Sequence, residues 1–92
     1  MKSIQSINFS KLQREDKLLI DGEIYIVVNN TCFYNMKKNI MEGSVELVKK
    51  DTPRLIPNYF VDYSFQTGKF LQFGKNDGTY EKIKVTSLAL QK

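Results

Sequence analysis

The chain has 92 residues, of which 41% are hydrophobic and 26% are charged, and its formal net charge is +4. This length corresponds to one domain and leaves no room for a separate catalytic domain, and the balance of residue types is that of an ordinary globular protein. We therefore predict a single domain over residues 1–92, with a lead-in segment at 1–16 and a β core at 17–90.

The only cysteine is Cys32, so an internal disulfide is excluded. It precedes Phe33 in an apolar context, from which we expect a buried, inert thiol. No apolar run near the N-terminus marks a secretory signal, and the longest apolar stretch, Ile24 to Val28, is too short to cross a bilayer. These features predict a cytoplasmic protein without a membrane segment.

The basic excess lies entirely in the second half of the chain. Residues 1–46 carry six basic and six acidic groups, whereas residues 47–92 carry eight basic and four acidic groups. A basic excess attracts polyanions such as nucleic acid, although an excess of this size equally describes a solvated surface that keeps a protein soluble.

The clearest local signal is the dipeptide Asp21-Gly22 between two β-prone runs. Both turn residues of a tight hairpin need positive φ, which glycine adopts freely and aspartate tolerates. Pairing across this turn places Leu19 opposite Ile24, and we expect both to be buried. Residues on the other side of the same strands are also apolar: Leu18, Tyr25 and Val27.

A second hairpin is predicted over residues 58–74, where apolar side chains alternate with polar ones. A three-residue turn, Gln66-Thr67-Gly68, with Gly68 in the left-handed region pairs Phe65 with Lys69, Tyr63 with Leu71 and Val61 with Phe73. This register gathers Tyr63, Phe65 and Phe73 on one face, so we expect these three rings to lie in the core.

The remaining segments give weaker signals. A third turn at Asn76–Gly78 leads into a strand that carries Ile83 and Val85, and residues 44–48 form another strand. Residues 31–43 are interpreted as a strand end at 31–34 followed by a basic loop that Gly43 closes. Residues 3–16 hold either a short helix or an extended lead-in. The fold class is all-β: a five- to six-stranded antiparallel barrel or curled sheet.

The stretch from Leu12 to Val28 resembles the opening of small Src-homology-3-like β-barrels of the Tudor and KOW kind. Those begin with a leucine, a Gly-Asp pair, an apolar strand, an Asp-Gly turn and a strand containing an aromatic residue two positions before valine. Asp16 matches the aspartate, whereas Glu15 stands where glycine is usual. The resemblance covers under a fifth of the chain, and it implies a scaffold that binds nucleic acid or protein segments.

We find no catalytic apparatus in the sequence. The chain has no histidine, which removes the commonest general base near neutral pH and the usual nucleophile systems. It offers one of the roughly four Cys or His ligands that structural zinc needs. No glycine-rich phosphate loop is present. We expect neither an enzyme nor a bound metal or cofactor.

The candidate binding residues lie in the basic second half. Aromatic side chains on a sheet with lysines around them are the components of a single-strand nucleic-acid platform, in which bases stack on rings and lysines meet phosphates. A domain this small also needs aromatic residues simply to fill its core. The candidates are Phe60, Lys69, Phe70, Lys75, Lys82 and Lys84. The two rings among them are expected on the face that carries Asp62, Ser64 and Gln72.

Two functions follow from these features. The first is a non-catalytic module that contacts nucleic acid through its basic, aromatic second half. The second is a protein-binding adaptor or inhibitor that docks on a larger complex. Lysine- and asparagine-rich proteins of this size are typical of AT-rich bacterial genomes and phages. One version of the second function is therefore an inhibitor that a phage or mobile element encodes and that acts on a host defence system.

Overall fold

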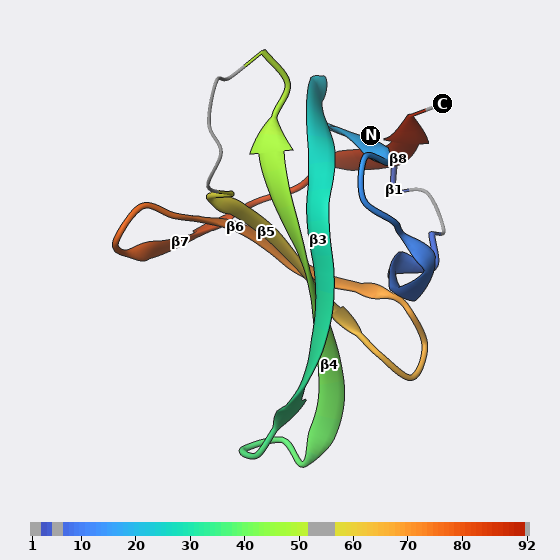
Figure 1. Cartoon of the computed structure of the whole chain (residues 1–92), viewed down its shortest axis with the longest axis vertical. Helices are drawn as coiled ribbons and strands as arrows, with labels where there is room; N and C mark the ends of the chain where they lie inside the picture. The colour runs from blue at the N-terminus through green and yellow to red at the C-terminus, as the bar shows by residue number, and fades with distance from the viewer. Residues whose placement is uncertain (1–2, 5–6, 52–56, 92) are drawn as a thin grey trace.

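A computed structural model describes residues 3–4, 7–51 and 57–91 (Figure 1). These residues form one sheet whose strands lie in the order β1-β8-β2-β3-β4-β5-β6-β7. The strands are β1 (Ser3–Ile4), β2 (Lys17–Ile20), β3 (Glu23–Asn35), β4 (Ile40–Lys49), β5 (Tyr59–Ser64), β6 (Phe70–Asn76), β7 (Tyr80–Ile83) and β8 (Ser87–Gln91). The predicted all-β fold is confirmed in the form of a curled antiparallel sheet, and among the described strands only β1 and β8 pair in parallel.

The β2–β3 hairpin forms as predicted. Leu19 lies opposite Ile24, and both Asp21 (φ 48°) and Gly22 (φ 84°) adopt the positive φ that the tight turn requires. Leu18, with its neighbours on that side, is fully buried, whereas Leu19 and Ile24 are only half-buried. The expectation that these two are core residues was wrong, because the sheet buries one face and leaves the other partly open.

The sheet has a core face and an outer face. The core face carries the buried side chains, and its largest members are Tyr63, Phe9, Phe73, Leu18, Ile20, Leu47 and Leu88. Tyr25, Tyr59 and Phe73 form an aromatic cluster there, with ring centroids 5.0–5.8 Å apart. The outer face carries the alternate residues of the same strands, which are half-buried: Ile26, Val48, Phe60, Asp62 and Gln72.

Strand β4 begins earlier than expected. The turn after β3 spans only residues 36–39, and Ile40 already pairs with Asn35. Gly43 was expected to close a loop; instead it lies inside β4, opposite Cys32 and Tyr63. A Cβ atom at Gly43 would overlap the ring of Tyr63, so the glycine gives the tyrosine room to lie flat against the sheet.

In the β5–β6 hairpin, one predicted cross-strand residue pair is confirmed and another is wrong. Val61 lies opposite Phe73 and Gly68 has φ 71°, as predicted, but a bulge after Asp62 pairs Tyr63 with Phe70 instead of Leu71. Tyr63 and Phe73 are buried, as expected. Phe65 is 45% exposed, because it lies past the last β5 residue, in the turn that joins β5 to β6.

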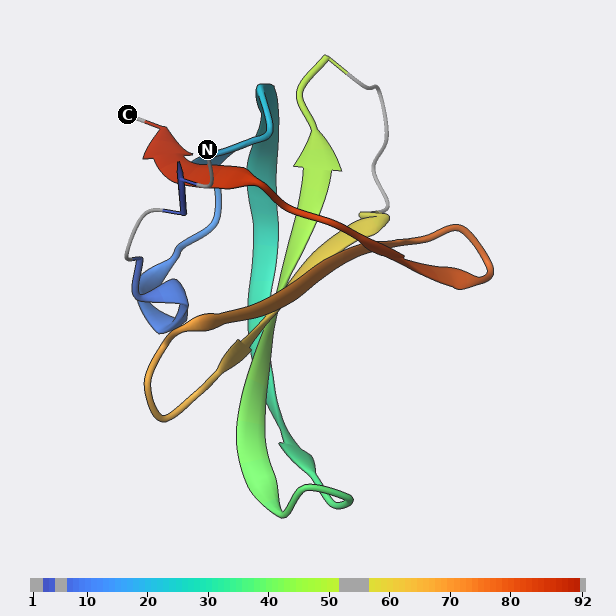
Figure 2. The ribbon, with the colours of Figure 1, turned by 180° about the vertical axis from the view of Figure 1, so that it is seen from behind.

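The last strand returns to the first hairpin. After β7 the chain crosses the molecule, and β8 pairs with β2 (Figure 2). The Asp21 carboxylate accepts hydrogen bonds from the Thr86 amide (3.0 Å), the Thr86 hydroxyl (2.6 Å) and the Ser87 amide (2.7 Å). These bonds lower the pKa of Asp21, chiefly through the Thr86 hydroxyl. The β2–β3 turn therefore fixes where β8 begins.

The described residues before β2 include one helical turn. It is the 3-10 helix η1 (Phe9–Lys11), with Asn8 as its N-cap. Leu12 is extended, and a turn closed by the Asp16 amide on the Gln13 carbonyl (3.1 Å), with Glu15 at φ 77°, then leads into β2. Phe9 is 1% exposed and packs against Tyr63. Of the two alternatives for residues 3–16, the described part is mainly an extended lead-in, and η1 serves to place one ring in the core.

Candidate interaction surface at the hairpin end

Exposed apolar side chains gather at one end of the sheet. Seven large hydrophobic residues are exposed in the part of the chain that the structure describes, and six of them belong to the β3–β4 and β5–β6 hairpins. We call these six the hairpin-end surface: Phe33, Tyr34, Met36, Ile40, Phe65 and Leu71. Met36, at the tip, is 85% exposed. Such concentrations of apolar surface mark interaction sites in soluble proteins.

Strand lengths explain why this end is uncovered. β2 pairs only with residues 23–26 of β3, so the remaining part of β3 extends beyond it together with β4 (Figure 1). The two hairpins are joined at this end, where the Phe65 amide donates to the Met41 carbonyl (3.3 Å) and Ser64 pairs with Glu42. The six residues thus lie on two connected hairpins.

A polar network gives the β3–β4 turn its shape. Asn35 Oδ1 accepts hydrogen bonds from the backbone amides of Lys37 (3.0 Å) and Lys38 (3.1 Å), and Asn39 takes positive φ (59°) to close the turn. An asparagine side chain that caps its own turn in this way holds the backbone in place. The turn therefore presents Met36 and Lys37 from a defined backbone.

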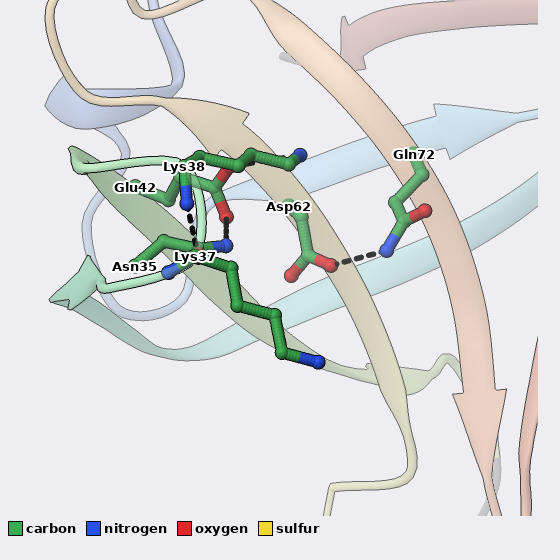
Figure 3. A network of polar contacts seen from close by, with 6 residues as sticks. All are labelled: Asn35, Lys37, Lys38, Glu42, Asp62 and Gln72. Carbon is green, nitrogen blue, oxygen red and sulfur yellow. Dashed lines mark hydrogen bonds and ion pairs between the residues drawn. The ribbon is translucent and has the colours of Figure 1, made fainter.

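Glu42 anchors this network from inside the sheet. Its carboxylate is hydrogen-bonded to Asn35 Nδ2 (3.3 Å) and paired with Lys38 Nζ (3.2 Å), and the residue is only 5% exposed (Figure 3). A buried carboxylate needs such partners because burial alone disfavours its charge. The Glu42–Lys38 pair thus neutralises one lysine of the turn.

The outer face beside this network is polar. Gln72 Nε2 donates to Asp62 Oδ2 (2.8 Å), and the two residues are opposite each other on β5 and β6. Lys37 leaves the turn in another direction from Lys38, with its ammonium group away from Glu42 (Figure 3). Within the described chain, Lys37 has no carboxylate at ion-pair distance, so it is the free cation of the turn.

The structure separates the two aromatic candidates, Phe60 and Phe70. Phe60 lies on the outer face, half-buried, between Glu46 and Gly74. Phe70 points to the core face, where its ring centroid is 6.1 Å from that of Phe9. The expectation that both share the face of Asp62 and Gln72 was wrong for Phe70, because the bulge at Leu71 reverses its side of the strand.

The four candidate lysines do not gather at one site. Lys69 is exposed beside the β5–β6 turn, Lys82 lies opposite Gly74, and Lys84 follows β7. Lys75 is paired with Asp77 (3.2 Å) and lies 5.9 Å from the centroid of the Tyr59 ring. Its hydrogen bond to Asp77 raises the pKa of Lys75. It is therefore already engaged by the protein.

The exposure of the apolar residues of the β3–β4 turn, and of nearby Cys32, was not predicted from the sequence. Cys32 is exposed, not buried as expected, because it lies on the part of β3 that extends past β2. The signal that could have located this turn is Asn35 with Asn39, two residues suited to turns that flank a Met-Lys-Lys sequence. Because polar residues surround Met36 in this segment, the sequence indicates that Met36 is exposed at the tip of a turn.

Tyr80 was also not identified from the sequence as an exposed aromatic residue. It is 42% exposed on the outer face, where a Cβ at Gly74 would overlap its ring. Burial raises the pKa of the Tyr80 hydroxyl, and the nearby Asp62 carboxylate raises it further. Because Gly74 pairs with both Phe60 and Lys82, these residues lie close together on the outer face.

One surface cavity of 540 Å³ lies beside the bulge of β3. It is lined by Leu12–Arg14, Val28–Asn30, Glu46 and Pro57. The bulge at Val28 displaces the strand there, and Asn30 Nδ2 ties the lead-in segment to β3 through the carbonyls of Phe9 and Leu12 (both 2.9 Å). The cavity thus lies between the lead-in and the extended half of β3.

The described residues contain no group of three or more His, Cys, Asp or Glu side chains that could hold a metal ion. In the same part of the chain, no helix has the length and apolar character needed to cross a membrane. No protein-family model, curated protein or solved structure matches the chain. Proposals about its function therefore depend on its own surface.

Proposed function

We propose that the chain is a non-catalytic protein-binding module that docks through the hairpin-end surface. The observation that carries this proposal is the concentration of six exposed apolar side chains on two connected hairpins. Clusters of aromatic and methionine side chains supply most of the binding energy at protein interfaces. The turn is held by Asn35 and Glu42, so little conformational entropy is lost when a partner binds it.

The charges around this surface define the partner's chemistry. Lys37 at the tip and Lys69 at the neighbouring turn are both exposed, whereas Lys38 is neutralised by Glu42. A partner with an apolar patch and acidic residues at its margin fits this arrangement. In our proposal the chain acts as an adaptor or inhibitor on a larger cytoplasmic protein complex, and a phage or mobile element is a suitable source for such an inhibitor.

Nucleic-acid binding is the second candidate, and one observation favours it. Phe60, Tyr80 and Lys82 gather around Gly74 on the outer face, and Lys82 and Lys84 form no ion pair with any described residue. Rings beside a lysine could stack on bases of a single strand. We rank this function second because Phe70 packs in the core and Lys75 is paired with Asp77.

Affinity capture from a bacterial lysate, with and without nuclease, separates the two functions. The double variant Ile40→Ser/Phe65→Ser removes two side chains of the hairpin-end surface, and Tyr80→Ser is the matched control because its ring is about equally exposed, at 42% against 37% and 45%. We expect the wild type and Tyr80→Ser to capture the same protein after nuclease treatment and the double variant to lose it.

The opposite pattern would contradict the proposal. If nuclease abolished capture, and Tyr80→Ser or Lys82→Gln weakened it while the double variant did not, the outer face would be a nucleic-acid platform. Circular dichroism of every variant tests whether the fold is retained, and we expect it to be, because all the replaced side chains are exposed.

A further inference from the structure

The second half of β3 has an open edge. On one side, residues 29–35 of β3 pair with β4. On the other side, β2 reaches only Ile26, and Val27 is bonded to the lead-in through the Glu15 amide and the Asp16 carbonyl (both 2.8 Å). Among the described residues, none pairs as a strand with this side of β3 beyond that point.

The hydrogen-bond pattern identifies which backbone groups face that open edge. The Asn39 amide donates to the Asn35 carbonyl (2.7 Å), so the polar groups of Asn35 point toward β4 and its turn. Along an antiparallel pair, residues alternate between pointing toward the partner strand and away from it. Cys32 and Tyr34 therefore direct their N–H and C=O groups outward.

This edge is not protected against pairing. Residues 29–35 read Asn-Asn-Thr-Cys-Phe-Tyr-Asn and contain no charge and no proline. The opposite edge of the sheet, β7, carries Glu81 and Lys82 and is followed by Lys84. Natural sheets discourage edge pairing with such charges, and an uncharged, exposed edge is a template for another strand.

We propose that a second copy of this chain occupies the edge, with the two β3 strands antiparallel about a two-fold axis at Phe33. Two outward-facing residues must pair with each other, and an axis at Phe33 places Cys32 of each copy opposite Tyr34 of the other. The reciprocal amide–carbonyl bonds follow from this register. Phe33 then faces its own counterpart across the axis, as an aromatic cross-strand pair.

The same register brings the tip of each copy to a complementary part of the other. Counted along the chain, Met36 lies as far after Phe33 as Asn30 lies before it, so the turn that carries Met36 comes to lie near Asn30, beside the 540 Å³ cavity. Lys37, on the same turn, comes to lie near Asn29, whose partner on β4 is Glu46. An exposed methionine meets a cavity and a free cation meets a carboxylate, which no adjacent register achieves together.

Cysteine cross-linking in a Cys32→Ser background tests this register. We expect Phe33→Cys alone to form an intermolecular disulfide under mild oxidation, at least about tenfold faster than Thr31→Cys alone or Asn35→Cys alone, because only position 33 faces itself. A mixture of the Thr31→Cys and Asn35→Cys proteins should cross-link efficiently, since those positions are opposite each other. Equal cross-linking at all three positions would overturn the proposal.

Sedimentation of the uncross-linked protein gives an independent test. The wild type should show a concentration-dependent dimer, and Tyr34→Pro should be monomeric because proline removes an outward amide without touching the β3–β4 ladder. Glu81→Pro on β7 is the matched control and should remain dimeric. A wild type that stays monomeric at millimolar concentration would overturn the inference. A monomer would leave all six residues of the hairpin-end surface to the proposed docking function, whereas in the dimer the second copy covers Phe33 and Met36. The docking test is separate in either case, because it uses Ile40 on β4 and Phe65 after β5.

Discussion

The hydroxyl of Tyr63 donates a hydrogen bond to the side-chain carbonyl of Asn30 at 2.6 Å, in the interior of the curled sheet. Asn30 Nδ2 in turn donates to the carbonyls of Phe9 and Leu12. One asparagine thus connects β5 to β3 and to the lead-in segment. A partly buried polar group of this kind contributes most to stability when all its partners are present.

Tyr63→Phe should lower the free energy of unfolding by about 1 kcal/mol, because it leaves Asn30 Oδ1 without its donor in a partly buried site. Tyr25→Phe is the matched control: Tyr25 is also buried, but its hydroxyl donates no hydrogen bond to another described residue. Urea denaturation followed by circular dichroism measures both. Equal losses in the two variants would show that the Tyr63–Asn30 bond contributes nothing.

Gly43→Ala should be the more damaging change at the same tyrosine. The added methyl group would overlap the Tyr63 ring, and overpacking of this kind costs about 1–3 kcal/mol. Ser44→Ala, one residue along β4 on the outer face, is the control and should stay within about 0.5 kcal/mol of the wild type. A wild-type melting temperature for Gly43→Ala would mean that the ring does not lie on the glycine.

Asp21→Asn should make stability less dependent on pH at the acid end. The pKa of Asp21 is lowered from its ordinary 3.8 by bonds from Thr86 and Ser87, so the folded state favours the ionised carboxylate. Its stabilisation is fully present above the unfolded-state pKa and is lost as the pH falls through the lower, folded-state value.

The measurement is the melting temperature from pH 7 down to pH 2. Asp21→Asn should melt below the wild type at pH 7, and the gap should shrink as the pH falls below about 4. Asp51→Asn, at another position with positive φ (69°), is the control and should melt like the wild type throughout. A gap for Asp21→Asn that grew toward low pH would contradict the linkage.

A double-mutant cycle on Glu42→Gln and Lys38→Met measures the pair behind the β3–β4 turn. Glu42 is 7% exposed in its side chain, but Lys38 is 62% exposed, so solvent screens the interaction. We expect a coupling energy of only about 0.5–1 kcal/mol. The variants should also speed amide exchange in residues 36–39. Coupling close to zero, with unchanged exchange, would leave Asn35 as the sole determinant of the turn.

The β2–β3 and β5–β6 hairpins could be predicted from the sequence because each has a glycine in its turn that favours positive φ. Asp21-Gly22 and Gly68 adopt the positive φ that the residue types suggested, and the pair Val61–Phe73 follows from the second turn. These are local features, because the backbone preference of a glycine acts within a few residues. The all-β class could be predicted for the same reason.

The bulge after Asp62 could not be predicted, and it decided the candidate site. One extra residue, Leu71, moved Phe70 from the outer face to the core and left Phe65 exposed beyond the strand. Alternation along a strand assigns faces only while the register is unbroken. Gly43 was misplaced because the ring that needs its missing side chain, Tyr63, is twenty residues away in sequence.

The pairing of β8 with β2 has a consequence for synthesis of the chain. Residues 88–91 lie opposite residues 17–20, and the hydrogen-bond donors to the Asp21 carboxylate, Thr86 and Ser87, come late in the chain. Until residues 86–91 have been synthesised, β2 lacks its β8 partner along one edge, and the Asp21 carboxylate lacks the hydrogen bonds from Thr86 and Ser87. Contacts this distant in sequence form late. Emergence of residues 86–91 from the ribosome is thus the event that permits the sheet to be completed, so a nascent chain stalled before Thr86 should remain sensitive to protease.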